Sequence, residues 1–260
     1  MVAARLTFKR KANGKCHQRV LREYYDESPP GDVDLSVSNA RVRPVSMEIA
    51  KRVILKYEWL GTMGQVTQRA YGIFFGMYCG GVTCISASYA ITSTCKRVGV
   101  LPTEASYLSR GACVSWASPN TNSKLLSWAC KYERKRGRKV VVAMSDTDAG
   151  EVGTVYQASG WLCLGRGSKW PQWVSPKGKI WSFQAFTTLA KNQGVSTTKL
   201  RSSLLSAGWY EQKTNPKFTY VAQLDRDPLL RARLLKLAVA YPKRAGSDPA
   251  TRQQSHAGKG

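Results

Sequence analysis

The chain has 260 residues, of which 43% are hydrophobic, and 40 Lys and Arg residues outnumber 16 Asp and Glu residues to give a formal net charge of +24. This apolar content is typical of a folded domain rather than a disordered chain, and no run of about 18 apolar residues predicts a membrane-spanning helix. The charge predicts a nucleic acid as partner, because so much self-repulsion is usually retained where a polyanion binds. A merely soluble basic surface and an anionic membrane surface are the alternatives.

The first 32 residues read as a basic N-terminal arm that ends in the turn-forming sequence SPPGD. This end of the chain lacks the apolar stretch of a secretory signal, so we expect the protein to stay in the cytoplasm of the cell that makes it. Seven cysteines occur without a CxxC pair, mostly within apolar runs. We expect them to be free buried thiols of a reducing compartment, with a disulfide framework or a zinc site as the alternative.

Residues 33–165 predict a compact core with the order β-α-β-β-β-α-β-α-β. Ser46 resembles an N-cap, and the apolar residues after it recur at helical spacing up to Gly61. Strands are expected at 33–45, 69–78, 80–90, 107–118, 140–146 and 161–165, with helices at 47–61 and 124–135 and a short helix within 146–160. The alternation late in this order implies crossover connections and some parallel pairing, which predicts an α/β fold with a mixed sheet flanked by helices.

Residues 166–244 differ in composition and predict a basic C-terminal α+β extension. Short strands are expected at KIWSF and FTYVAQL, and DPLLRARLLKLAVAYPKR reads as a capped amphipathic helix that Pro242 stops. Residues 245–260 are polar and lack core-forming residues, so a disordered tail is expected there.

The loop between the strand at 107–118 and the helix at 124–135 is a candidate anion site. The N-terminus of a helix offers free N–H groups and the positive end of the helix dipole. Side chains around the loop supply further donors: Arg110, Ser115, Asn120, Asn122 and Ser123. Plain N-capping by Asn122 or Ser123 is the alternative explanation of these residue types.

A second candidate site follows the buried strand at 140–146, where ligand sites of α/β sheets collect. Asp146 could accept a proton from an amine, and Tyr156 could act as an acid. Together with Asp148 they could also hold a hard cation, although three such residues are weak evidence for a metal. The alternative is that Asp146 caps a helix and Tyr156 packs in the core.

A third candidate is the segment YEWLGTMG, residues 57–64. Glu58 stands at a helix end where the dipole disfavours its charge, which either costs stability or serves a purpose. Trp59 could be a platform on which a base stacks, with a core position as the alternative.

Positive charge is clustered at three places that predict a phosphate-contacting surface, with solvated faces as the alternative. The residues expected to contact nucleic acid are Arg10, Lys11, Lys135, Arg136, Arg138, Arg231 and Arg233.

Four motifs in this order resemble the Mom family of phage DNA-modification proteins, which is similar in fold to the GNAT acyltransferases. The motifs are YEWLGTMG, RGACVSWASPNTNSKLLSWAC, MSDTDAGEVGTVYQASGW and the terminal AYPKR. The resemblance covers about residues 35–244. It implies a GNAT-like catalytic core at 33–165 and a transferase that converts N6 of adenine in double-stranded DNA to its carbamoylmethyl (acetamido) form. This modification would protect phage DNA from host restriction nucleases.

The resemblance also implies roles for the candidate residues. Asp146, Tyr156, Ser123 and Glu58 would form the catalytic set, with Tyr57 near the acceptor amine. Chemistry on a base normally requires the base to leave the stack, which favours aromatic residues near the site. Arg110, Ser115, Asn120, Asn122 and Ser123 would bind the donor.

The identity of the donor stays open between two classes. GNAT enzymes hold the pyrophosphate of coenzyme A with a glycine-containing turn, and here the corresponding place reads SPNTNSK without either glycine. Acetyl-CoA is one candidate. The other is an aminoacyl-tRNA, with a glycyl group matching the carbon and nitrogen content of the carbamoylmethyl product. Charged tRNA is therefore a possible second partner beside DNA, while a metal requirement and the oligomeric state are not predicted.

Two rival functions follow from the same observations. The chain could be a non-catalytic DNA-binding protein on a GNAT-like scaffold, which would need only the basic surface. It could also be an N-acyltransferase that acts on RNA or protein.

Overall fold

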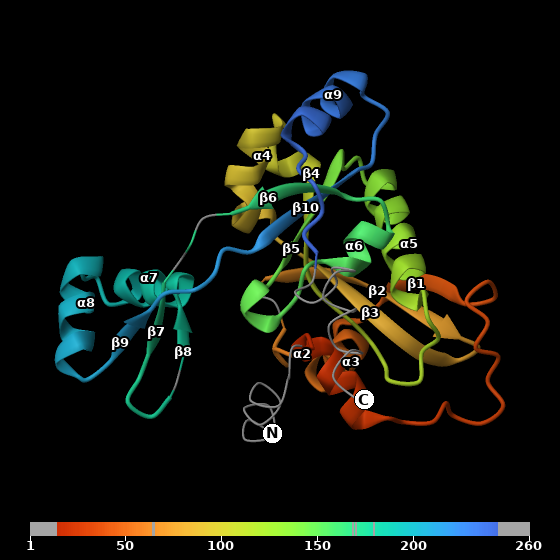
Figure 1. The fold of residues 1–260 in the computed structure, drawn as a ribbon, viewed down its shortest axis with the longest axis horizontal. Coiled ribbons are helices and arrows are strands. Elements are labelled where there is room, and N and C mark those ends of the chain that lie inside the picture. The colour runs from red at the N-terminus through yellow and green to blue at the C-terminus, as the bar shows by residue number, and fades with distance from the viewer. Residues whose placement is uncertain (1–14, 64–65, 168, 170, 179, 244–260) are drawn as a thin grey trace, which may run out of the picture.

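The computed structural model describes residues 15–63, 66–167, 169, 171–178 and 180–243, and its centre is a seven-stranded mixed sheet (Figure 1). The strands lie in the order β1-β2-β3-β4-β5-β10-β6. Their bounds are Arg41–Val45 (β1), Thr67–Phe75 (β2), Tyr78–Ser86 (β3), Ala105–Cys113 (β4), Val140–Ser145 (β5), Leu162–Arg166 (β6) and Phe218–Gln223 (β10). The mixed α/β sheet flanked by helices that the sequence predicts is confirmed.

The pairing pattern of the sheet follows from its connections. β1 to β4 form antiparallel pairs in chain order, and β10 pairs antiparallel with both β5 and β6. β4 and β5 are parallel. Parallel neighbours need a crossover, which helix α5 (Thr121–Lys135) supplies.

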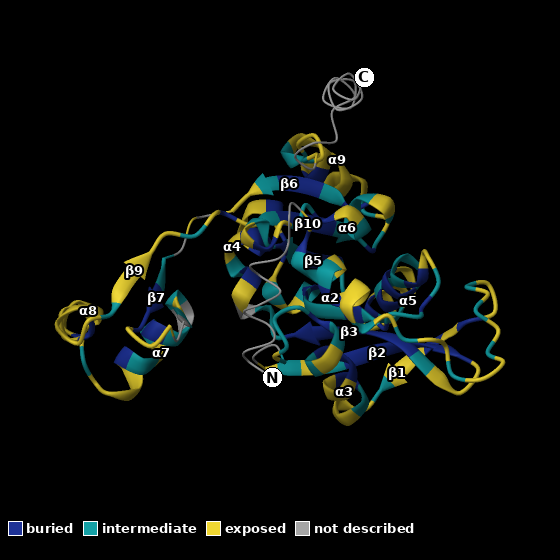
Figure 2. Ribbon diagram, turned by 60° about the horizontal axis from the view of Figure 1, so that its bottom comes forward, coloured by how far each residue is buried: buried dark blue, intermediate teal, exposed yellow. Residues whose placement is uncertain are grey.

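Alternating residues of the strands face two separate apolar layers, as the period of two in a strand requires. Val141 and Ala143 of β5 pack on one face together with Leu125 and Leu126 of α5. Val140 and Val142 face the other side, against the helices α4 (Thr92–Val98) and α9 (Pro228–Leu237). Helix α3 (Met47–Tyr57) also covers this second face, through Ala50, Val53 and Ile54. Figure 2 shows the sheet as the buried centre of the main body.

A buried glutamate joins α5 to the sheet. Glu133 is fully buried, and its carboxylate accepts two hydrogen bonds of 3.0 Å from the guanidinium of Arg69 on β2. The hydroxyls of Tyr71 and Ser106 also donate to it. Each oxygen of the buried charge therefore has partners, which is what makes burial of a carboxylate tolerable.

A second, three-stranded sheet forms a small lobe between β6 and β10 (Figure 1). Its strands lie in the order β8-β7-β9, with bounds Gln172–Val174 (β7), Ile180–Ser182 (β8) and Tyr210–Gln212 (β9). Two helices complete the lobe, α7 (Phe183–Asn192) and α8 (Thr197–Ser206). They share an apolar core of their own, centred on Trp173, Phe186 and Leu200.

The division between core and C-terminal extension looks different in the structure. We expected residues 33–165 to form the core and 166–244 an extension, but β10 lies inside the central sheet and α9 packs against β6 and α4. The segment 172–212 is thus an insertion between two strands of the central sheet. A short extended run such as FTYVAQ does not reveal which strand it will pair with, because pairing partners are set by tertiary contacts.

Several helices differ from the prediction. Helix α2 (His17–Tyr25) lies within the expected N-terminal arm, and α4, α7 and α8 were not predicted. The last helix begins as expected, because the carboxylate of Asp227 accepts from the N–H groups of Leu229 and Leu230. It ends at Leu237, before the predicted stop at Pro242. The expected tail at 245–260 lies outside the described residues.

All seven cysteines are free thiols. Within the described residues, no helix is long and apolar enough to cross a membrane.

Candidate active site

The candidate site lies where β4 and β5 separate. The two strands pair only from Ala105 to Leu108 and from Val140 to Ala143. Beyond this point Ser109 is an extra residue in the pairing of β4 with β3, whose register shifts between Cys84 and Ile85. Such a bulge bends a strand, and the parting strands leave a cavity in the middle of the sheet.

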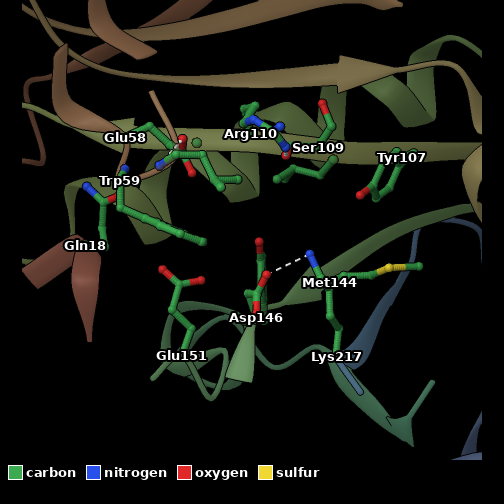
Figure 3. A pocket seen from close by; sticks show the side chains of 14 residues that line it. Gln18, Glu58, Trp59, Tyr107, Ser109, Arg110, Met144, Asp146, Glu151 and Lys217 are labelled. Carbon is green, nitrogen blue, oxygen red and sulfur yellow. Dashed lines mark hydrogen bonds and ion pairs between the residues drawn. The ribbon is translucent and has the colours of Figure 1, made fainter. Parts of the chain in front are cut away.

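Three carboxylates from different parts of the chain line this cavity: Glu58, Asp146 and Glu151 (Figure 3). Asp146 directly follows β5 and forms an ion pair with Lys217, with 2.8 Å between Oδ2 and Nζ. Its other oxygen accepts from the N–H of Asp148 at 3.1 Å. Asp146 therefore caps the 3-10 helix Thr147–Ala149 and lines the cavity, so both interpretations of this residue apply.

Glu151 has a strongly altered acidity. Burial raises the pKa of its carboxyl to about 7, and the negative charges of Glu58 and Asp146 raise it further in the same direction. A carboxyl with a pKa near neutrality exchanges protons readily at physiological pH, which is the property of a general acid or base.

Glu58 is buried at the C-terminal end of α3, with 5% of its surface exposed. Its carboxylate accepts hydrogen bonds from the N–H groups of Leu60 and Gly61, at 2.9 and 3.1 Å. These donors offset the unfavourable dipole end that the sequence indicates. The carboxylate is thus held in place as it faces the cavity.

Tyr156, on the short helix α6 (Thr154–Ala158), lines the same cavity. Burial, together with the negative charge of Glu151, raises the pKa of its phenol, so the hydroxyl keeps its proton. Its ring packs against Trp161 and Tyr220. Tyr156 therefore belongs both to the core and to the site.

Tyr220 of β10 fixes the loop that carries Glu151. Its hydroxyl donates to the carbonyl of Val152 and accepts from the amide of Gln157 at 3.1 Å. Gly153 has a φ of +70°, and a Cβ there would lie 2.3 Å from the Tyr220 ring. The close approach of this loop to β10 therefore requires glycine at this position.

Arg110 and Trp59 complete the wall opposite Asp146 (Figure 3). The guanidinium of Arg110 donates to the carbonyl of Thr62 at 2.9 Å. The N–H of Trp59 donates to the amide oxygen of Gln18 at 3.0 Å, which ties α2 to the mouth of the cavity. Trp59 is only half-buried, as a stacking platform must be.

The cavity is small, about 90 Å³. Typical ligand pockets measure roughly 300 Å³ or more, so a whole base enters only if lining side chains move. Lys217, with half of its side chain exposed, stands among the groups that could swing away.

The structure does not bring the other predicted residues to this cavity. Ser123 lines a separate cavity of about 550 Å³, together with Arg231. Ser115 donates to the carboxylate of Glu27 at 3.4 Å and accepts from its N–H at 3.1 Å. The hydroxyl of Tyr57 also donates to Glu27. Ser123 is therefore separated from Asp146, Tyr156 and Glu58, with which we expected it to act.

The N-terminus of α5 was the predicted anion site for the donor. Asn120 is the N-cap residue but makes no capping hydrogen bond through its side chain, and Asn122 is half-buried in the first turn. The N–H of Thr121 donates to the carbonyl of Ser118. The loop before α5 therefore contacts charges of both signs, since the carboxylate of Glu27 accepts from Ser115 and the guanidinium of Arg22 donates to the carbonyls of Ser115 and Ala117.

The described cations that are expected to contact nucleic acid lie at the end of α5 and on α9. Lys135 and Arg136 are exposed at the end of α5, and Arg138 is half-buried just beyond it. Arg231 and Arg233 are exposed on α9, where Arg233 donates to the carbonyl of Val98 at 3.2 Å. Arg10 and Lys11 lie outside the described residues. Their contact with nucleic acid stays a prediction.

Sequence reasoning missed Glu151 and Lys217. Glu151 stands in the same polar loop as Asp146, which is the signal that could have found it. Lys217 precedes β10 and has no local signal, since only the pairing of β10 with β5 brings it to the site. Among the described residues, no group of three or more His, Cys, Asp or Glu side chains is placed to hold a metal ion.

Solved structures with a similar arrangement include three acetyltransferases. A GNAT family acetyltransferase from Elizabethkingia anophelis, solved with acetyl-CoA bound, is 9% identical over 72% of this chain and 99% of that chain, with a TM-score of 0.41. The ribosomal-protein-S18-alanine N-acetyltransferase from Escherichia coli is 6% identical over 72% of this chain and 96% of that chain, with a TM-score of 0.40. The IAA acetyltransferase from Bacillus cereus is 12% identical over 72% and 100%, with a TM-score of 0.41.

No curated protein matches the sequence. A family model does: that of the Mom protein family matches residues 39–243. This range includes both Glu58 and the loop with Asp146, Glu151 and Tyr156, and it confirms the resemblance seen in the four sequence motifs. The chain belongs to the Mom protein family.

Proposed function

We propose that this protein is a transferase that modifies the N6 amine of adenine in DNA to a carbamoylmethyl form, as its family membership implies. The observation that carries the proposal is the cavity between β4 and β5, where a carboxyl with a pKa of about 7, Glu151, faces Asp146 and the protonated Tyr156. A pocket of this composition suits proton transfer during the attack of an amine.

Each residue that lines the cavity would assist a different step of an acyl transfer. The amine nitrogen forms a bond to the donor's carbonyl carbon, and its proton passes to the carboxylate of Glu151. Tyr156 gives its proton to the leaving group as the bond to that group breaks, and regains one from solvent. With a glycyl donor this transfer gives N6-glycyl-adenine, an isomer of the carbamoylmethyl base. An isomerisation must then bond the methylene carbon to N6 and leave a terminal amide, whereas an acetyl group lacks the nitrogen that this amide needs. Asp146 and Glu58 attract the positive charge that develops on the attacking nitrogen, since both carboxylates face the cavity.

Trp59 would hold the base after it has left the double helix. An adenine that reacts at N6 must be flipped out of its stack, and a half-buried tryptophan at the mouth of the cavity offers a face for stacking. The net charge of +24 supports a polyanionic substrate. Cleavage by restriction nucleases that read adenine would then be blocked, which is the benefit to a phage in its bacterial host.

The donor is proposed as one of two classes, an acyl-coenzyme A or an aminoacyl-tRNA. A glycyl group has the carbon and nitrogen content of the carbamoylmethyl product, and the place that corresponds to the coenzyme A turn reads SPNTNSK without either glycine. Both points favour the aminoacyl-tRNA. An amino group on the donor would also suit a cavity with three carboxylates.

A donor panel tests the proposal. Purified protein is incubated with duplex DNA, total tRNA or a protein extract, each with labelled acetyl-CoA or labelled glycyl-tRNA, and the label is followed to its acceptor. We expect label in adenine of the DNA with one of the two donors. Label in RNA or protein, with none in DNA, would contradict the proposal and favour the N-acyltransferase alternative.

A further inference from the structure

The small lobe contains a helix-turn-helix arrangement that the candidate active site does not use. Helices α7 and α8 are joined by only four residues, 193–196, and run crosswise to each other (Figure 1). Gly194 in the connection has a φ of +63°, a conformation that glycine adopts without strain. Two helices joined by a three- to four-residue turn with glycine are typical of DNA-binding lobes.

Hydrogen bonds and apolar contacts fix this turn. The N–H groups of Gly194 and Val195 donate to the carbonyls of Lys191 and Ala190 at 3.1 and 3.0 Å, which closes the end of α7. The hydroxyl of Ser196 then accepts from the N–H of Lys199 at 3.1 Å and begins α8. These hydrogen bonds fix the angle at which α8 follows α7.

Helix α8 presents almost its whole surface to solvent. Only Leu200 and Leu204 are buried, and they pack on Phe186 and Ala190 of α7. Apart from the exposed Leu205, the outward residues are polar or basic, and they include Thr197, Thr198, Lys199, Arg201, Ser202 and Ser203. Figure 2 shows this helix as the exposed end of the lobe. A helix of ten residues is about 15 Å long, and the major groove of DNA, about 12 Å wide, admits one helix.

The charge of the lobe favours the same partner. Residues 172–213 contain six Lys or Arg residues and one acidic residue, Glu211. Glu211 forms an exposed ion pair with Arg201, at 2.9 Å. Lys199 stands in the first turn of α8, where recognition helices place the residues that reach base edges.

We propose that α8 is a recognition helix that enters the major groove of duplex DNA, with Thr198 and Lys199 directed at the DNA. The lobe thereby holds the duplex and selects the sequence around the base that is presented to the cavity between β4 and β5. This inference deepens the proposed function and rests on it for the choice of DNA as the ligand, but DNA binding by the lobe is measured without any donor or chemical step.

Charge reversal of two matched lysines tests the proposal. Lys199→Glu on α8 is compared with Lys51→Glu, which reverses an equally exposed lysine on α3. Binding of the full chain to a random-sequence duplex is measured by fluorescence anisotropy across salt concentrations, and thermal melts check that both variants are folded. We expect Lys199→Glu to weaken binding at least about tenfold and to lower the slope of log affinity against log salt by about one phosphate contact. Lys51→Glu should change binding by less than about twofold.

Dimethyl sulfate probing of a bound duplex examines the groove itself, because the reagent methylates guanine N7, which lies in the major groove. We expect a short protected segment with the unaltered protein, and a weakened or displaced one with Thr198→Ala. Equal binding by both lysine variants, or no N7 protection, would overturn the proposal. So would a loss of tRNA binding with intact duplex binding in Lys199→Glu. Intact N7 protection by a protein that leaves adenine unmodified would instead contradict the proposed function alone.

Discussion

Lys217, just before β10, forms an ion pair with Asp146, just after β5, with 2.8 Å between Nζ and Oδ2. The two residues are far apart in the chain and meet because Phe218, next to Lys217, pairs with Ser145, next to Asp146. The insertion that contains α7 and α8 thus returns to the central sheet at the candidate active site. This contact links the end of the insertion to the cavity that the three carboxylates line.

Asp146→Asn should abolish most of the transfer activity while leaving the fold intact. Asparagine can still accept from the N–H of Asp148 and cap the 3-10 helix, but it cannot carry the negative charge that attracts the attacking amine. We expect a loss of at least about 10²-fold in turnover. Asp148→Asn is the control, because Asp148 holds Asn215 outside the cavity; an equal loss in both variants would refute a specific role for Asp146.

Activity should rise with pH through about 7. The pKa of Glu151 is raised from its ordinary value of 4.5 to about 7 by burial first and by Glu58 and Asp146 next. A base must be ionised to accept a proton, so turnover should fall as the pH drops below this value. A rate that stays constant between pH 6 and 8, roughly one unit on either side of that pKa, would show that Glu151 is not the base.

The Glu151 carboxyl should make the folded protein less stable as the pH rises, whereas activity should increase. A raised pKa in the folded state favours the protonated form, so the stability it contributes is complete below 4.5 and is lost as the pH rises through about 7. Glu151→Gln stays neutral, and its melting temperature should exceed that of the unaltered protein increasingly over this range. Glu48→Gln, at an exposed residue of α3, should show no such trend; a parallel trend in both would disprove the assignment.

Tyr156→Phe should lower turnover with little effect on the melting temperature. Phenylalanine preserves the ring contacts with Trp161 and Tyr220 but removes the proton that the leaving group needs. The expected loss is about 10²-fold in turnover, with less change in substrate affinity. Tyr132→Phe serves as the control, since its hydroxyl donates to the carbonyl of Val42 away from the cavity. Full activity in Tyr156→Phe would exclude the phenol as the acid.

Glu133→Ala should destabilise the protein far more than Glu104→Ala. Removing Glu133 leaves the guanidinium of Arg69 and the hydroxyl of Tyr71 without their buried acceptor, which costs about 3–5 kcal/mol of unfolding free energy. Glu104 pairs with Lys139 near the surface, and such pairs contribute about 1 kcal/mol or less. Urea denaturation measures both values. Similar values for the two variants would mean that the contacts of Glu133 with β2 contribute little to the free energy of unfolding.

The sequence predicts the central sheet well because its strands carry strong local signals. Val140–Ala143 is an unbroken apolar run, and the helices at α3 and α5 have apolar residues at helical spacing with clear ends. Asp146 and Tyr156 lie in a polar loop directly after a buried strand, and Glu58 lies at a helix end, so all three could be found as candidates. They do line one cavity.

Where the structure differs from the sequence prediction, the cause is a tertiary contact that the local sequence does not show. The family resemblance grouped Ser123 with Asp146, but the structure places Ser123, in the first turn of α5, at the cavity that Arg231 also lines. Lys217 reaches the site only through the pairing of β10 with β5. Helix α8 contains β-branched and small polar residues of modest helix propensity, and its stability comes from Leu200 and Leu204 packing on α7.

Nucleoside mass spectrometry tests the central claim most directly. DNA is isolated from bacterial cells that express the unaltered chain or its Asp146→Asn variant, and is digested completely to nucleosides. We expect carbamoylmethyl-modified deoxyadenosine with the unaltered chain and nearly none with the variant, while both proteins bind DNA equally. Unmodified deoxyadenosine in both samples, with DNA binding intact, would contradict it and leave a DNA-binding protein without catalysis.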